Sequence, residues 1–190
     1  FTRESDRQRL EDIRARSTIV ISYGQCASSA GVTALKNHQD DYKHYVYHSD
    51  SNQAHLDSTK AQPISAAIKV DYEVLGCPIN KEEFIDILSH LIHQKEPIIP
   101  NYPVCVECKR RETICRVLIG EACLGMVARA GCGAPCPADG IACDACRGFI
   151  DQANLQAVQK VLINKANFSE ARAKSHAQLF NGYHPEGLAK

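Results

Sequence analysis

The chain has 190 residues with 22 basic and 22 acidic side chains, so its formal net charge is zero. A neutral chain gives no electrostatic reason to expect binding to nucleic acid or to an anionic membrane. No apolar run approaches the roughly 18 residues that a membrane-spanning helix needs, so we expect no transmembrane segment. The charged opening, FTRESDRQRL, has the features of neither a signal peptide nor a transit peptide.

The sequence opens with a predicted helix over residues 5–17. Leu10 and Ile13 share one face of this helix, and Ser5 or Asp6 could cap its start. The next apolar run, residues 19–21, is typical of a buried parallel strand.

A predicted loop over residues 25–31 places Cys26 just past the carboxyl end of that strand, the edge at which open α/β sheets hold ligands. A short helix follows through Val32, Leu35 and Lys36. Residues 38–63 are polar and read as an exposed loop with some helix. We expect its four histidines to be surface residues: His38, His44, His48 and His55.

A second strand is predicted where apolar and polar residues alternate, from about residue 68 to residue 75. It leads directly into Gly76-Cys77-Pro78, so a second cysteine follows a second strand end. A lone cysteine is most often a buried small hydrophobe. The matched positions of Cys26 and Cys77 leave open whether they share a metal site instead.

Three further helices are predicted. Asn80, with Glu83 three residues later, predicts a capped start for residues 82–94, and a proline-rich stretch, residues 96–103, closes the domain. Near the end, residues 151–165 read as a helix, and Ser169 caps a last helix over 170–181. The stripe expected to be buried on the first of these is Phe84, Ile87, Leu88 and Leu91, and we interpret His90 and His93 as structural.

Eight of the ten cysteines fall between residues 105 and 146, with spacing C-x2-C-x6-C-x7-C-x8-C-x3-C-x6-C-x2-C. The surrounding stretch, residues 105–148, has little periodicity and many glycines and prolines, so it cannot build an apolar core of its own. A [4Fe-4S] cluster takes four cysteine thiolates, often two of them from a C-x2-C hairpin. Two such pairs and four single cysteines provide the ligands of two clusters.

Two other uses of these cysteines remain open. Two C-x2-C pairs could form a zinc ribbon, although this would leave four thiols unexplained and the pairs are unusually far apart. A disulfide framework suits small secreted chains, whereas the helix and strand pattern elsewhere needs no such staples. Zinc would make the chain a structural protein rather than a redox protein.

Three stretches resemble the small, electron-transferring subunit of [NiFe] hydrogenases. They are VISYGQCASSAGV, IKVDYEVLGCPIN and the run PVCVECKRRETICRV…GEACLG…RAGCGAPCP…CDACRG. The resemblance is strongest to the cytoplasmic kinds that reduce nicotinamide or deazaflavin cofactors or feed heterodisulfide reductase. It implies an α/β fold: a partial flavodoxin-like parallel-sheet domain (1–98), an irregular two-cluster iron–sulfur segment (99–150) and C-terminal helices (151–190).

The resemblance also implies ligand sets. Cys105, Cys108, Cys123 and Cys132 would hold a distal [4Fe-4S] cluster, and Cys115, Cys136, Cys143 and Cys146 a medial one. Cys26 and Cys77 match half of the family's proximal cluster site, whose other half is an N-terminal C-x2-C that this sequence lacks. We expect that segment to lie outside the sequence, which opens on a helix with no strand before it; an altered proximal site is the alternative.

The function that follows is an electron relay within a cytoplasmic hydrogenase complex, with no catalytic residue in this chain. The nickel–iron site would belong to a large partner subunit, and an acceptor subunit carrying flavin or iron–sulfur clusters would take the electrons. The alternative is an iron–sulfur electron-transfer subunit of a non-hydrogenase redox complex, against which the eight-cysteine run argues. The short basic run Lys109, Arg110 and Arg111 is either a solvated surface or a docking site for an acidic partner.

Overall fold

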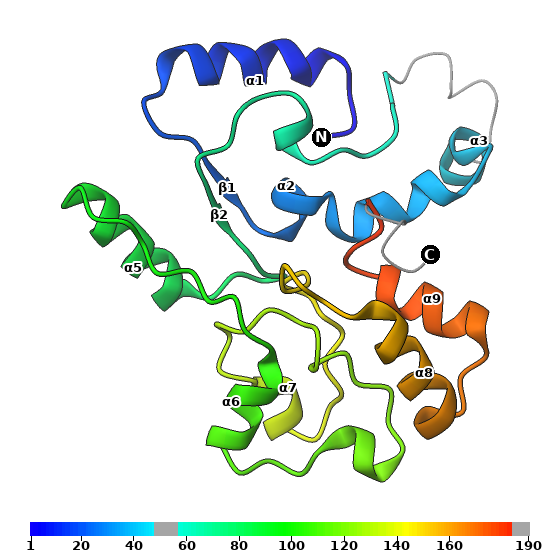
Figure 1. The fold of residues 1–190 in the computed structure, drawn as a ribbon. Helices are drawn as coiled ribbons and strands as arrows, with labels where there is room; N and C mark the ends of the chain where they lie inside the picture. The colour runs from blue at the N-terminus through cyan, green and yellow to red at the C-terminus, as the bar shows by residue number, and fades with distance from the viewer. Residues whose placement is uncertain (48–56, 184–190) are drawn as a thin grey trace.

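The computed structural model describes residues 1–47 and 57–183 and has a mixed α/β architecture around two short parallel strands. Strand β1 (Ile21–Tyr23) pairs with β2 (Tyr72–Val74) in the register Ile21 to Tyr72. Figure 1 shows these strands, with the N-terminal helices, in one half of the molecule, and the cysteine-rich segment with the last helices in the other. The predicted α/β class and parallel pairing are confirmed.

Strand β1 has the predicted length but begins two residues later, whereas β2 is shorter than predicted. The residue before β1, Val20, is buried, but its backbone N–H donates to the carboxylate of Asp71 rather than to a neighbouring strand. In the second strand, apolar and polar residues alternate from residue 68, but only Tyr72–Val74 pair with β1. Only three residues of β1 are available as partners, so the ladder ends with them.

Helix α2 (Gln25–Ser29) occupies the stretch predicted as a loop. Gly24 turns the chain out of β1 with a φ of 85°, a conformation that glycine adopts readily. The helix is held back onto the strand by a buried 2.6 Å hydrogen bond between the hydroxyls of Ser22 and Ser28. Cys26 therefore lies in the first turn of a helix, directly after the strand.

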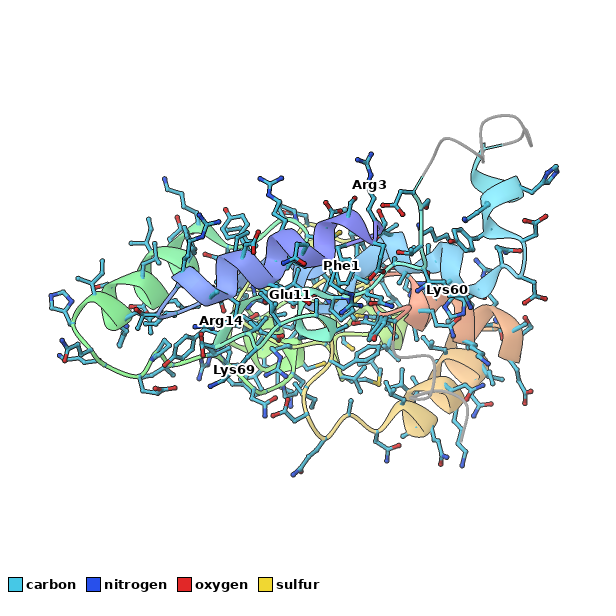
Figure 2. All side chains as sticks on the ribbon, turned by 90° about the horizontal axis from the view of Figure 1, so that it is seen from above. Phe1, Arg3, Glu11, Arg14, Lys60 and Lys69 are labelled. Carbon is cyan, nitrogen blue, oxygen red and sulfur yellow. The ribbon has the colours of Figure 1, made fainter. Side chains whose placement is uncertain are left out.

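Helix α1 (Ser5–Arg16) is confirmed in extent but not in its buried face. None of its residues is buried, and Ile13 is 40% exposed. The cap position is Glu4, without a side-chain cap bond, so neither predicted capping residue serves. Figure 2, seen from above, shows the helix with Arg14 toward the end where Lys69 lies, and Arg14 donates to the carbonyl of Lys69 at 3.3 Å.

The stretch after α2 continues as the 3-10 helix η1 (Gly31–His38) and as α3 (Tyr42–Tyr47), and η2 (Ile64–Ala66) precedes β2. A short helix was predicted at η1, and some helix at α3. The expected surface positions of His38 and His44 are confirmed, since neither is buried. His48 and His55 lie outside the described residues.

Helix α5 (Lys81–Ile92) projects from the body of the molecule in Figure 1. Its predicted cap is confirmed, because the Asn80 side chain accepts a hydrogen bond from the backbone N–H of Glu83. Of the predicted buried stripe only Ile87 is fully buried, while Phe84, Leu88 and Leu91 are half-buried.

The cysteine-rich segment contains three short helices: α6 (Val104–Arg110), η3 (Arg116–Ile119) and α7 (Pro135–Ala138). It packs against α8 (Leu155–Ala166) and α9 (Glu170–Gln178), which begin at the side-chain caps Asn154 and Ser169. One apolar core joins segment and helices, with Leu124, Val158 and Leu162 among its most buried members. The segment thus shares an apolar core with α8 and α9.

The end of the described chain returns to the N-terminal half. The amide of Gln25 donates to the Phe180 carbonyl and to Asn181, both at 3.4 Å, and Asn181 donates to the Ala145 carbonyl at 3.3 Å. These contacts connect α2 to the cysteine-rich segment through the C-terminal turn. In the described part of the chain, every helix is too short or too polar to cross a membrane.

Candidate metal centres

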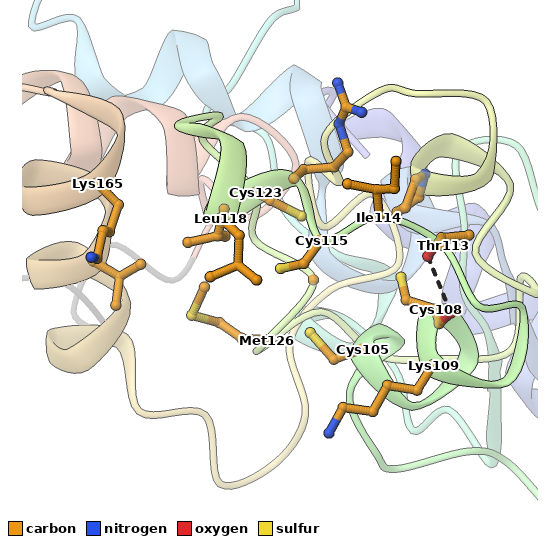
Figure 3. A pocket seen from close by; sticks show the side chains of 15 residues that line it. Cys105, Cys108, Lys109, Thr113, Ile114, Cys115, Leu118, Cys123, Met126 and Lys165 are labelled. Carbon is orange, nitrogen blue, oxygen red and sulfur yellow. Dashed lines mark hydrogen bonds between the residues drawn. The ribbon is translucent and has the colours of Figure 1, made fainter.

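The first cysteine-lined pocket has a volume of about 360 Å³ and contains four thiols. Two come from α6, one helical turn apart and so on the same face of the helix. The third stands at the start of η3, and the fourth on the loop that follows. Figure 3 shows their sulfur atoms around one space, with Leu118 and Lys165 on the left of the view. The four residues are Cys105, Cys108, Cys115 and Cys123.

Backbone hydrogen bonds fix the walls of this first pocket. The N–H of Cys105 donates to the Gly125 carbonyl at 3.2 Å, and the Thr113 hydroxyl donates to the Cys108 carbonyl at 3.1 Å. A Cβ at Gly125 would lie 3.4 Å from the sulfur of Cys123 and 3.7 Å from that of Cys105. These are ordinary van der Waals distances, so the backbone at Gly125 lies one side chain's contact away from two of the thiols.

The second pocket, of about 170 Å³, holds the other four cysteines of the run and one from the N-terminal half. Cys136 stands on α7, and the remaining three lie on loops. Its thiol-bearing residues are Cys132, Cys136, Cys143 and Cys146, with Cys77 in the wall.

The two pockets are adjacent. The backbone N–H of Cys143, in the second, donates to the sulfur of Cys123, in the first, at 3.3 Å. Cys77 also lines the second pocket, and its backbone lowers the pKa of the Cys146 thiol there. The order through the molecule is therefore the turn after β2, then the second pocket, then the first.

Burial dominates the acidity of these thiols. It raises the pKa of Cys105 to about 11, with the neighbouring thiols of Cys123 and Cys108 adding to the effect. Burial likewise raises the pKa of Cys143, Cys123, Cys132 and Cys146. Thiols in such an environment lose their protons when a positively charged metal centre replaces them. Burial thus disfavours the thiolate form that a reactive cysteine needs.

A buried ion pair supports the second pocket from outside. Arg147 is 3% exposed and donates to the Glu83 carboxylate at 2.6 Å, to the Leu75 carbonyl at 2.8 Å and to the Ala130 carbonyl at 3.0 Å. Its charge opposes the effect of burial on the pKa of Cys132 and Cys146. The arginine therefore joins α5 and the end of β2 to the cysteine-rich segment.

A second buried carboxylate, Glu107, lies on α6 between the cysteines of the first C-x2-C pair, Cys105 and Cys108. It accepts hydrogen bonds from the Gly131 N–H at 2.8 Å and from the Cys132 thiol at 3.8 Å. Sequence reasoning missed Glu107, Arg147 and Glu83. Only the position of the first two beside cysteines could have drawn attention to them.

The pockets group the eight cysteines differently from the division expected by family resemblance. That division placed Cys132 with the first hairpin and Cys115 with the last; in the structure these two are exchanged. Cys132 lines the second pocket although its thiol also lies 3.8 Å from the Glu107 carboxylate of α6. Of the expected proximal pair, Cys77 reaches the second pocket, while Cys26 lines neither of these two pockets.

Across the described ranges, no three His, Cys, Asp or Glu side chains converge closely enough to hold a single metal ion. A tetrahedral zinc site needs its sulfurs about 2.3 Å from one point. Two sets of four thiols match the donor set that two [4Fe-4S] clusters require.

Residues 2–91 match the model of a protein family described as NADH ubiquinone oxidoreductase, 20 Kd subunit. The match covers the N-terminal half with both strands, Cys26 and Cys77. The cysteine-rich segment lies beyond it.

Curated relatives extend the similarity. The chain is 34% identical to a subunit of the F420-non-reducing hydrogenase vhu of Methanocaldococcus jannaschii, over 78% of this chain and 62% of that protein. It is 36% identical to the delta subunit of sulfhydrogenase 2 of Pyrococcus furiosus, over 76% of this chain and 61% of that protein. The chain thus spans about three fifths of the length of these relatives.

Among solved structures, an NAD+-reducing [NiFe]-hydrogenase in the H2-reduced state aligns with a TM-score of 0.45 and 23% identity. The alignment covers 52% of this chain and 63% of that chain.

Proposed function

The chain is a relative of hydrogenase small subunits, and on that premise we propose that it is the electron-relay subunit of a [NiFe] hydrogenase complex. The nickel–iron site would be on a large partner subunit. The electrons would leave to an acceptor subunit that carries flavin or iron–sulfur clusters. The observation that carries the proposal is the pair of adjacent pockets, one lined by four cysteines and the other by five, which together hold all eight cysteines of the run.

We assign Cys105, Cys108, Cys115 and Cys123 to a distal [4Fe-4S] cluster, and Cys132, Cys136, Cys143 and Cys146 to a medial one. Such clusters, when bound, supply one-electron redox chemistry. The protein fixes their positions, excludes water and places backbone N–H groups against the ligand sulfurs, as Cys143 does toward Cys123. Hydrogen bonds of this kind raise the reduction potential of a cluster.

The order of the pockets supports a relay with two ends. Cys77 and the strand ends stand beside the medial set, so the large subunit would approach from that side. A third, proximal cluster would need Cys26 and Cys77 together with two cysteines from outside this sequence. We place the complex in the cytoplasm, where a reducing environment keeps thiols available for metal ligation.

Two alternatives remain to be separated. The family model's own description points to a respiratory-type redox complex, but the model ends before the eight-cysteine segment. A structural zinc protein would need thiols that converge on single points, which the described residues do not provide.

The test is a metal and sulfide count on the chain purified without oxygen together with its bound partners. The relay predicts about eight irons with matching sulfide per chain, or about twelve with a complete proximal site. Nickel on a large co-purifying subunit would identify a hydrogenase. Zinc without sulfide would reject the relay.

A further inference from the structure

Exposed apolar side chains gather beside the first pocket. Leu118 is 82% exposed, Ile114 70% and Ile119 53%. Together with the exposed basic residues Lys109 and Arg110 at the end of α6, they form what we call the docking face. Ile114, Leu118 and Lys109 also line the mouth of the pocket, as Figure 3 shows. An apolar patch rimmed by charge is typical of a protein–protein interaction site.

The docking face surrounds the most accessible thiol of its pocket. Cys115, next to Ile114, is exposed, whereas Cys105 and Cys108 are partly buried and Cys123 is buried. A partner seated on this face would come close to the cluster ligands without any rearrangement of the chain. The face is therefore continuous with the proposed electron path.

The charge of the face indicates what kind of partner fits it. The chain as a whole is neutral, but residues 109–119 hold four basic side chains and one acidic one. Arg116 is paired with Glu121, whereas Lys109 and Arg110 form no ion pair with any residue that the structure describes. Unpaired cations at a rim steer an acidic partner and raise its association rate.

We propose that the docking face receives the electron acceptor of this chain, an acidic redox protein with an apolar centre. The proposal rests on the relay function and specifies its partner. Apolar contact with Leu118 and Ile119 would hold the complex together, and the basic rim would set its orientation. Rim charges act mainly on the association rate, whereas buried apolar contacts act mainly on dissociation.

The test uses the cluster-loaded full chain, reduced, and mixed in a stopped-flow instrument with either of two probes. One probe is a small acidic ferredoxin, and the other is basic cytochrome c. The variants are Arg110→Glu and Leu118→Asn, with Ile119→Asn in reserve if the latter does not load iron. The control is Lys95→Glu, the same charge change three residues past the end of α5, where the side chain is also exposed.

The wild-type rate with ferredoxin should fall as salt rises, and Arg110→Glu should lower it about 10-fold at low salt. The same variant should not slow cytochrome c, and Lys95→Glu should change neither rate. Leu118→Asn should lower the ferredoxin rate at every salt concentration, with the reduction potential unchanged.

Equal ferredoxin rates in wild type and variants, with iron and sulfide present, would overturn the docking face but not the relay. Absence of iron and sulfide from the wild type would overturn the relay itself. Sedimentation velocity tests whether the docking face instead binds a second copy of this chain. A wild-type dimer that Leu118→Asn dissociates would mean that the face binds a second copy, and would overturn the proposal.

Discussion

At the scale of single residues, Arg147 is the side chain on which the second pocket most depends. It is buried, adjacent in sequence to Cys146, and donates to acceptors in three parts of the chain. Its partner Glu83 is almost as inaccessible, with a side chain 10% exposed. Breaking a buried pair leaves one uncompensated charge, which costs far more than the pair itself contributes.

Replacement of Arg147 by glutamine should therefore destabilise the chain by about 3–5 kcal/mol, because the Glu83 carboxylate loses its cation. The double variant Arg147→Gln/Glu83→Gln should recover a large part of that loss. Urea midpoints of the cluster-loaded proteins give the comparison. A double variant no more stable than Arg147→Gln alone would show that the lost hydrogen bonds to Leu75 and Ala130, not the unpaired carboxylate, account for the effect.

Two glycines with positive φ separate backbone strain from steric overlap. At Gly76, before Cys77, a Cβ would stand 2.6 Å from the Pro78 carbonyl oxygen, with φ at 137°. At Gly133, with φ at 73°, a Cβ would meet nothing within 4 Å. Alanine at Gly133 should cost about 1–2 kcal/mol from conformation alone.

Gly76→Ala should cost clearly more than Gly133→Ala, because the backbone of the turn must also move and the turn carries Cys77 to the second pocket. Thermal unfolding of the two variants side by side provides the measurement. Equal losses of stability would mean that the backbone of the turn after β2 can move at little energetic cost, and that Cys77 is not held firmly in place.

At the scale of elements, what the sequence predicts well is local. The caps at Asn80 and Ser169 depend on residues three positions apart, and both are formed. Helix α2 was missed because its support comes from far away: Gln25 contacts Phe180 and Asn181, about 155 residues on. No pattern within residues 25–31 predicts this helix.

In the site, too, the sequence predicts features that depend on local spacing and misses those that depend on contacts between distant residues. The eight clustered cysteines and their C-x2-C pairs are visible in the spacing, and all eight line one of the two pockets. Their grouping into two pockets is not visible, because it depends on contacts between cysteines far apart in the sequence, such as Cys123 and Cys143. The supporting pair Arg147 and Glu83 lies 64 residues apart and left no signal in the sequence.

Asp71 joins three elements and gives a prediction on pH. Its carboxylate accepts hydrogen bonds from the Val20 N–H, at the start of β1, and from Arg14 of α1. The Val20 bond first, then Arg14, hold the pKa of Asp71 below its ordinary value of 3.8. A lowered pKa means that the stabilisation is fully present above 3.8 and is lost as pH falls through the lower folded-state value.

Asp71→Asn should therefore be less stable than wild type at pH 7 and at pH 5, and the difference should shrink below pH 3.8. Urea unfolding at several pH values provides the measurement, with Asp12→Asn, an exposed position of α1, as the control. A difference that persists unchanged at pH 2 would mean that the carboxylate charge is not what ties α1 to the strands.

At the scale of the whole molecule, the two halves meet where the proposed electron path passes. Cys77 comes from the N-terminal half and stands in the wall of the second pocket, while the Cys143 N–H spans from that pocket to the first. The medial position is thus the one through which every electron would pass between the two ends of the chain.

The proposed assignment of each cysteine to a cluster follows the two pockets, and serine variants can check it. Cys115→Ser should alter the spectrum of the same cluster as Cys123→Ser, and Cys132→Ser that of the same cluster as Cys146→Ser. Electron paramagnetic resonance of the reduced, cluster-loaded chain distinguishes the two sets, and iron analysis should show loss confined to one cluster in each variant. If Cys115→Ser instead behaves like Cys146→Ser, the division expected by family resemblance is right. The loops around the two pockets would then have to rearrange when iron is bound.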